Sequence, residues 1–127
     1  MGADIWIYTK KEPNFDGIDS KIVEKEPNGS YYYRDSYNVT NLAWVIDLSY
    51  LKSFEKSPTK FLKKLTKITD EQIEKAVREN IKNELDYMLG REYTEEEIQE
   101  IIHFLKTKRE YLKRLIEAGI RKIEYSI

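Results

Sequence analysis

The sequence predicts an α+β fold, a small antiparallel sheet packed with about four helices. Segments with the two-residue alternation of strands come first, segments with helical periodicity follow, and one more alternating segment comes last. A chain of 127 residues corresponds to a single domain, residues 1–127, and is long enough to bury a core.

The predicted sheet begins with residues 3–9, in which both faces of the strand are largely apolar. Such a strand is covered on both sides, or it packs one face on helices and exposes aromatic side chains on the other. A hairpin is predicted next, because Asn28-Gly29 accepts the positive φ angles of a tight turn. Its arms are residues 21–26 and 30–35.

Four helical segments are predicted after the hairpin. The first begins near residues 36–38, which are acceptable N-caps, and runs to about residue 50. The second begins at Ser57-Pro58, because serine caps helices and proline fits the first helical turn. After the helices, residues 120–127 alternate in polarity and are predicted to form the closing strand.

The third and fourth helices each begin with a capping-box pattern. Thr69 with Gln72 opens the third helix, which Gly90 ends, and Thr94 with Glu97 opens the fourth. The connection between them is short, so we expect these two helices to form an antiparallel αα-hairpin.

The composition excludes several kinds of site and location. The chain has no cysteine and one histidine, which rules out a disulfide framework and thiolate or multi-histidine metal sites, so we expect no metal and no cofactor. No apolar run approaches the roughly 18 residues of a membrane span and no secretory leader opens the chain, which predicts a soluble cytoplasmic protein. Heavy use of lysine, glutamate and isoleucine is typical of a heat-adapted source.

The densest group of polar and aromatic side chains lies between the hairpin and the first helix. Arg34 offers a planar fork of donors suited to a carboxylate or phosphate, and Asp35 can accept from backbone amides at a helix start. Asp4, on the neighbouring strand, is expected to complete a polar pocket. The candidate ligand-binding residues are Asp4, Tyr33, Arg34, Asp35, Asn38, Asn41 and Trp44.

A purely structural interpretation of the same residues stays open, in which Arg34 pairs with Asp4 or Asp35 and the asparagines cap the helix. Binding is favoured over catalysis, because the group holds a carboxylate but no nucleophile beside a base. We therefore predict a non-enzymatic domain that binds a protein partner or a small polar ligand.

A second candidate surface is the lysine-rich segment of residues 52–67. Lysine with interleaved phenylalanine is what single-stranded nucleic-acid surfaces use to neutralise phosphates and stack bases. An amphipathic helix with its phenylalanines in the core has the same pattern. Nucleic-acid binding is therefore the alternative function, and its residues would be Lys52, Phe54, Lys56, Lys60, Lys63, Lys64 and Lys67.

Acidic and basic segments alternate along the chain, which favours docking within the molecule or self-association over a uniform DNA-binding face. The long last helix has an apolar stripe that predicts core packing, although Lys108 interrupts it. A homodimer that uses part of this surface stays open.

Three stretches also resemble a known group of sequences. Residues 2–5 read Gly-Ala-Asp-Ile, residues 32–38 read Tyr-Tyr-Arg-Asp-Ser-Tyr-Asn, and residues 41–44 read Asn-Leu-Ala-Trp. The pattern resembles small uncharacterised phage, bacterial and archaeal proteins with an N-terminal Gly-Ala-Asp-Ile and a central Tyr-Phe-Arg-Asp-Ser-Tyr-Asn. This chain departs from it with Tyr33 in place of phenylalanine and Tyr50-Leu51 in place of two tryptophans.

The resemblance covers about the first 50 residues and brings no known activity with it. It implies that Asp4, Arg34, Asp35 and Asn38 are the residues to mutate first. A phage or mobile-element context would imply an interaction or accessory protein.

Overall fold

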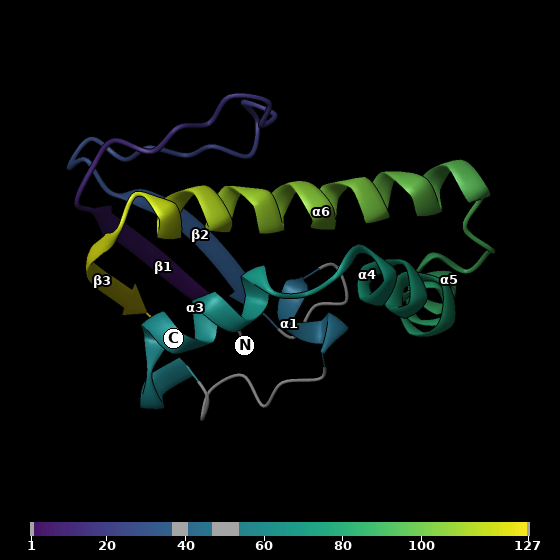
Figure 1. Ribbon diagram of the computed structural model, residues 1–127. Helices are drawn as coiled ribbons and strands as arrows, with labels where there is room; N and C mark the ends of the chain where they lie inside the picture. Colours follow the sequence, from purple (N-terminus) through teal and green to yellow (C-terminus); the bar gives the residue numbers. More distant parts are fainter. Residues whose placement is uncertain (1, 37–40, 47–53, 127) are drawn as a thin grey trace.

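The computed structural model describes residues 2–36, 41–46 and 54–126 and has the predicted α+β architecture (Figure 1). Three antiparallel strands form one sheet in the order β2-β1-β3. The strands are β1 (Gly2–Thr9), β2 (Tyr31–Ser36) and β3 (Ile120–Ser126). The helices are α1 (Leu42–Val45), α3 (Pro58–Thr66), α4 (Asp70–Ala76), α5 (Lys82–Leu89) and α6 (Glu95–Glu117), and a π-helical segment, η1 (Val77–Ile81), joins α4 to α5.

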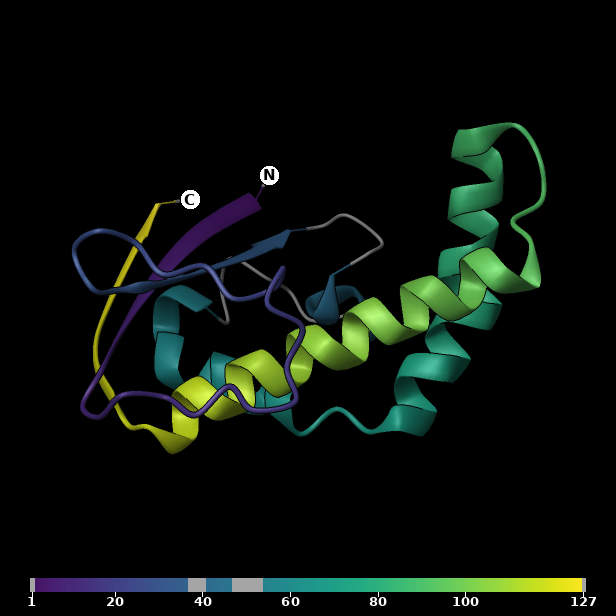
Figure 2. The ribbon, with the colours of Figure 1, turned by 90° about the horizontal axis from the view of Figure 1, so that it is seen from above.

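The helices that the structure describes lie on one face of the sheet, which Figure 2 shows from above. On that face Ala3, Ile5 and Ile7 of the central strand are fully buried. Because side chains alternate along a strand, Asp4, Trp6 and Tyr8 lie on the opposite, partly exposed face. The sequence left two possibilities for this strand, and the one with an aromatic outer face is confirmed.

The turn of the predicted hairpin is present, but its first arm is not a strand. The Gly29 N–H donates to the Glu26 carbonyl at 2.9 Å, and Gly29 has a φ of +89°. Residues 21–26 then meet β2 only at an isolated bridge between Lys25 and Tyr31. The main partner of β2 is β1, paired from Gly2 opposite Ser36 to Ile7 opposite Tyr31.

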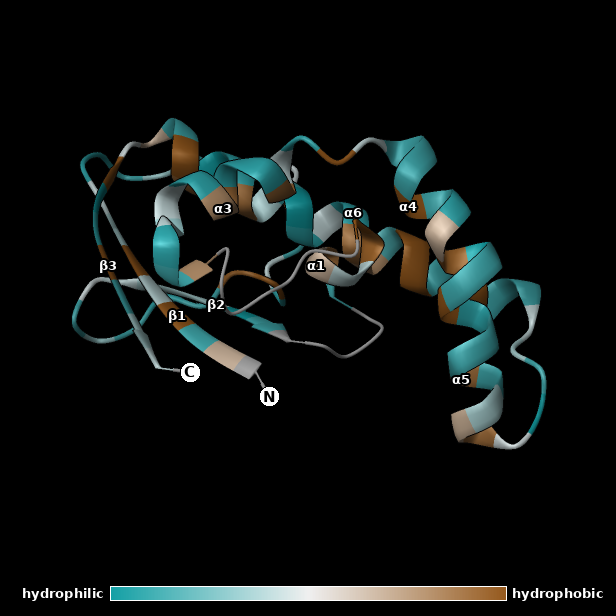
Figure 3. Ribbon diagram, turned by 90° about the horizontal axis from the view of Figure 1, so that it is seen from below, coloured by the Kyte–Doolittle hydropathy of each residue, from teal (hydrophilic) through white to brown (hydrophobic). Residues whose placement is uncertain are grey.

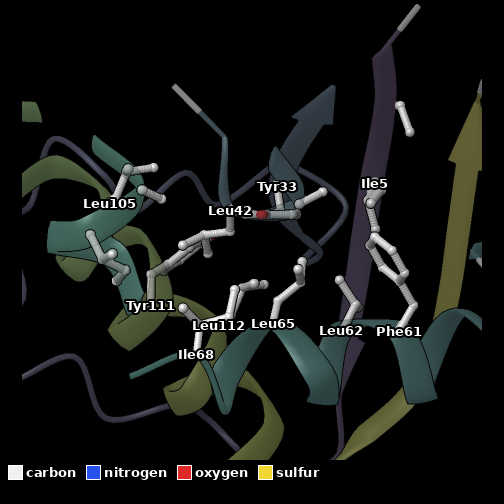
Figure 4. Packing of buried hydrophobic residues seen from close by; sticks show 14 of the residues in the cluster. Ile5, Tyr33, Leu42, Phe61, Leu62, Leu65, Ile68, Leu105, Tyr111 and Leu112 are labelled. Carbon is white, nitrogen blue, oxygen red and sulfur yellow. The ribbon is translucent and has the colours of Figure 1, made fainter. Parts of the chain in front are cut away.

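The hydrophobic core lies between the covered face of the sheet and the helices α3 and α6. Ile5 projects from the central strand toward Phe61 and Leu62 of α3 (Figure 4), and Tyr33 of β2 is buried in the same cluster. Leu105, Tyr111 and Leu112 of α6 are also buried in this cluster. Burying a side chain of this size contributes about 1.5–3 kcal/mol, so this layer supplies much of the drive to fold.

The first helix differs from its prediction at its start. Residue 36 still belongs to β2, and α1 begins at Leu42 with Asn41 as N-cap, although the Asn41 side chain makes no capping hydrogen bond. The rest of the predicted extent, including residues 37–40 and 47–50, lies outside the described residues.

The later helix starts are confirmed. Proline occupies the first turn of α3, with Ser57 as N-cap but without a side-chain capping bond. Both capping boxes form: the Thr69 hydroxyl accepts from the Gln72 N–H, and the Thr94 hydroxyl accepts from the Glu97 N–H. Local side-chain chemistry therefore sets where α4 and α6 begin.

The predicted αα-hairpin is formed by α4 and η1 against α6. Asp70 and Glu74 of α4 pair with Arg109 and Lys106 of α6 in antiparallel order. The helix passes through one π-turn, in which the Lys82 N–H bonds to the Val77 carbonyl. It then continues as α5, which projects away from the sheet (Figure 2).

The end of α5 exposes large side chains next to the connection to α6, where part of the ribbon in Figure 3 is brown. Tyr87 and Met88 are 87% and 73% exposed, and Leu89 is 45% exposed. Met88 therefore lies outside the core although it follows Leu85 by three residues, because α5 extends beyond the surface that α6 covers.

Candidate functional site

Asp4 and Arg34 are cross-strand neighbours on the uncovered face of the sheet and form an ion pair, as the purely structural interpretation of the sequence expected. Arg34 Nη1 lies 2.7 Å from Asp4 Oδ1, and the Arg34 side chain is 52% exposed. The Tyr32 hydroxyl donates to the same Asp4 oxygen. That bond, assisted by Arg34, lowers the pKa of Asp4 below its usual value.

Asp35 lies on the other face of the sheet, because consecutive residues of a strand point in opposite directions. It is fully buried and accepts a 2.9 Å hydrogen bond from the Tyr33 hydroxyl. The sheet therefore divides the predicted cluster into an outer pair, Asp4 with Arg34, and an inner pair, Tyr33 with Asp35.

Lys108 of α6 reaches the inner pair. Its Nζ lies 4.9 Å from the centre of the Tyr33 ring and donates a 2.8 Å hydrogen bond to Asn41 Oδ1. Burial lowers the pKa of Lys108 to about 8; the Asp35 carboxylate opposes this shift and the Arg34 guanidinium adds to it. A lysine amine with this pKa gains or loses its charge near neutral pH.

A groove of about 300 Å³ lies between β2 and α6, and we call it the β2–α6 groove. Residues 32–34 of β2 form one wall, and the opposite wall consists of Phe104, Lys108 and Tyr111. Lys21, Ile22 and Glu24 close one end. The Tyr111 hydroxyl holds the walls together by donating to the Tyr32 carbonyl at 2.8 Å.

The remaining predicted residues lie in three places. Asn41 is buried beside Lys108, so it adjoins the inner pair. Trp44 is 37% exposed and lines a different hollow, of about 400 Å³, with Asn80 and Asn83. Asn38 lies outside the described residues.

The described lysines of residues 52–67 lie on the exposed side of α3 and on the residues that flank it. Lys56, Lys60 and Lys64 line a hollow of about 440 Å³ together with Ser57 and Phe61. Lys63 and Lys67 are exposed on the same helix and its C-cap, and Lys52 lies outside the described residues.

Phe54 is fully buried, with its ring edge-on to Phe61 at 5.6 Å and to Tyr125 at 4.8 Å between ring centres. The phenylalanines of this segment therefore belong to the core, and stacking on bases would require other rings.

Lys108 is the functional candidate that the sequence treated only as an interruption. The signal was its spacing: it lies three residues after Leu105 and four before Leu112, both buried. A lysine at such an inward position must either leave the core or find polar partners there. Its partners come from residues 33, 35 and 41, which no local pattern connects to α6.

In the described ranges, His, Cys, Asp and Glu side chains nowhere gather in the threes that a metal ion would need. No helix among the same residues has both the length and the apolar character that crossing a bilayer requires.

Comparison with known proteins gives no relative: no family model, no curated protein and no solved structure matches this chain.

Proposed function

We propose that this protein is a non-enzymatic binding domain that takes an anionic group of a partner or small ligand in the β2–α6 groove. The observation that supports this best is the approach of two cations, Arg34 and Lys108, to one hollow with aromatic walls. Ligand pockets typically combine such an apolar lining with a few polar groups that fix orientation.

Arg34 and Lys108 each keep capacity for a ligand. Asp4 occupies one nitrogen of Arg34, whereas a guanidinium has five N–H donors. Lys108 donates to Asn41, and an ammonium has three donors. An anion between the two cations would relieve their repulsion and raise the pKa of Lys108, so its binding should weaken as pH rises through about 8.

A thermal-shift screen of carboxylates, phosphates, nucleotides and acidic sugars tests the proposal. Compounds that raise the melting temperature should lose this effect in Arg34→Gln and Lys108→Met. The matched control is Lys113→Met, which removes an exposed cation from the same helix. If no compound raises the melting temperature, or if the control loses the effect equally, the groove is not an anion site.

Nucleic-acid binding by the lysine segment is a second candidate, supported by the hollow that Lys56, Lys60 and Lys64 share. Retention on heparin that falls steeply with salt would favour it, because released counterions make such binding salt-dependent. Replacing the three lysines by glutamine should then reduce the retention, and elution at low salt by the wild-type protein would dismiss this function.

Other expectations from the sequence stay predictions: a cytoplasmic location, a heat-adapted source, a homodimer and the resemblance to phage-related proteins. Each is compatible with a small accessory domain that binds a partner. Sedimentation analysis tests the homodimer directly.

A further inference from the structure

Within residues 2–36, 41–46 and 54–126, the outer edge of β2 has backbone partners along its first half only. The Tyr32 N–H donates to the Glu24 carbonyl and the Ser30 carbonyl accepts from the Glu26 N–H, so Ser30 and Tyr32 direct their backbone groups away from β1. Backbone groups alternate in direction along a strand, so those of Arg34 also point away from β1. Among the described residues, the Arg34 N–H and C=O have no backbone partner.

This open part of the edge adjoins the β2–α6 groove, since Arg34 and Tyr33 line the groove with Phe104 and Lys108. An edge strand beside an apolar groove is the arrangement in which an extended peptide adds to a sheet. Its backbone bonds to the edge and its alternate side chains enter the groove.

We infer that the β2–α6 groove binds an extended acidic peptide segment that pairs with β2 at Arg34 as an additional strand. This inference rests on the proposed anion-binding function and names its ligand. The charges support an acidic peptide: Lys21, Arg34 and Lys108 surround the groove, and Glu24 is the one acidic side chain in its described lining.

The two faces of the sheet also define the side-chain pattern of the peptide. A residue opposite Arg34 would point to the uncovered face, where the exposed guanidinium meets an acidic side chain. The residues on either side of it would point toward α6, where Phe104 is 40% exposed and lines the groove opposite Tyr33. Acidic and apolar residues should therefore alternate in the ligand.

The experiment selects a randomised peptide library displayed on phage against the full chain and resynthesises the enriched sequence. Two further peptides carry N-methyl groups on one or the other alternate set of backbone amides. Methylation of the set that pairs with Arg34 should weaken binding about tenfold or more, as loss of hydrogen bonds with no replacement does. Methylation of the other set should leave affinity unchanged.

Two variants of Arg34 distinguish the contribution of its backbone N–H to peptide binding from that of its side-chain charge. Arg34→Gln removes the charge and keeps the N–H, whereas Arg34→Pro removes both. Proline is tolerated on an edge strand where the N–H points away from the sheet. The proline variant should therefore bind more weakly than the glutamine variant, and Lys113→Met should bind as the wild type does. If Arg34→Pro does not fold, the pair of methylated peptides decides alone.

Several outcomes would overturn strand addition: no enriched peptide, enrichment without acidic residues, or equal effects of the two methylation sets. A dimer whose β2 edges pair with each other would also overturn it, by making a second copy the occupant. If small anions still stabilise the protein through Arg34 and Lys108, the proposed function survives that failure. If neither peptides nor anions respond to Arg34→Gln and Lys108→Met, both proposals are wrong.

Discussion

Tyr32 and Tyr33 are neighbours in the sequence, yet their hydroxyl groups bond to carboxylates on opposite faces of the sheet. Tyr32 donates to Asp4 on the uncovered face, and Tyr33 donates to the buried Asp35. The two tyrosine–carboxylate hydrogen bonds should contribute differently to stability, because water can replace a lost donor only on the uncovered face.

This contrast gives a prediction for two matched variants. Tyr33→Phe should lower the free energy of unfolding by about 1–3 kcal/mol, because a buried carboxylate loses a donor. Tyr32→Phe should cost less, about 1 kcal/mol or below, since Asp4 keeps Arg34 and contact with water. Urea denaturation measures both values, and equal losses would contradict the assignment of these tyrosines to a buried and an exposed face.

Lys108 gives a prediction for the pH dependence of stability. Its pKa is about 8 in the folded protein and near 10.5 when exposed, so the unfolded chain binds more protons between these values. Lys108 therefore makes stability rise with pH from about 8 to about 10.5. The unfolding free energy of the wild type minus that of Lys108→Met should therefore rise as pH increases over this window. A constant difference would show that the lysine is not buried.

The two capping boxes show why element starts could be predicted from the sequence. Each box is formed by side chains three residues apart, such as Thr94 and Glu97, so no distant contact is needed to establish it. The first arm of the hairpin failed for the opposite reason. Asn28-Gly29 determines a turn, but the length of the pairing depends on competition for β2, and β1 is the more extensive partner.

The start of α6 gives a prediction for acid stability. The Arg91 guanidinium, followed by the Thr94 backbone N–H, lowers the pKa of Glu97 to about 2. Its stabilisation is complete above pH 4.5 and is lost as pH falls toward 2. Glu97→Gln keeps a capping-box acceptor but removes the ion pair, so its stability should fall less over this range.

Guanidinium denaturation at a series of acidic pH values measures this effect. The control is Glu100→Gln, which changes an exposed carboxylate of the same helix. Its unfolding free energy should fall with acidic pH as that of the wild type does. Parallel curves for wild type and Glu97→Gln would contradict the role of the Arg91 pair.

The whole molecule consists of a well-packed body and a projecting helix, and their local stabilities should differ. In α5 the one buried residue is Leu85, whereas α6 buries six, among them Leu105 and Leu112. Regions with few buried apolar contacts open at low free-energy cost. Hydrogen exchange should therefore show weaker protection in α5 than in β1 or the middle of α6. Equal protection throughout would mean that α5 is held by contacts beyond those described.

At this scale the sequence predicted the fold class and the order of its elements better than the candidate site. The periodicities of 2 and 3.6 identify faces, and buried faces must meet, which gives the α+β arrangement. To predict the site, one would have to know that Lys108 lies against Tyr33 and Asn41. Lys108 and Asn41 are 67 positions apart in the sequence. The separation of Arg34 from Asp35 follows from strand alternation alone and was within reach of the sequence.

The π-turn of η1 has a consequence for how this protein tolerates changes in length. A π-turn contains one residue more than the α-helical turn it replaces, and both turns complete about one revolution of the helix. Deleting the exposed Glu79 would therefore convert η1 into uninterrupted α-helix and would leave the direction and the rotation of α5 nearly unchanged. Asn83 would keep its place in the hollow that it shares with Trp44. A one-residue deletion in the regular helix α6 would instead rotate every residue beyond it by about 100°.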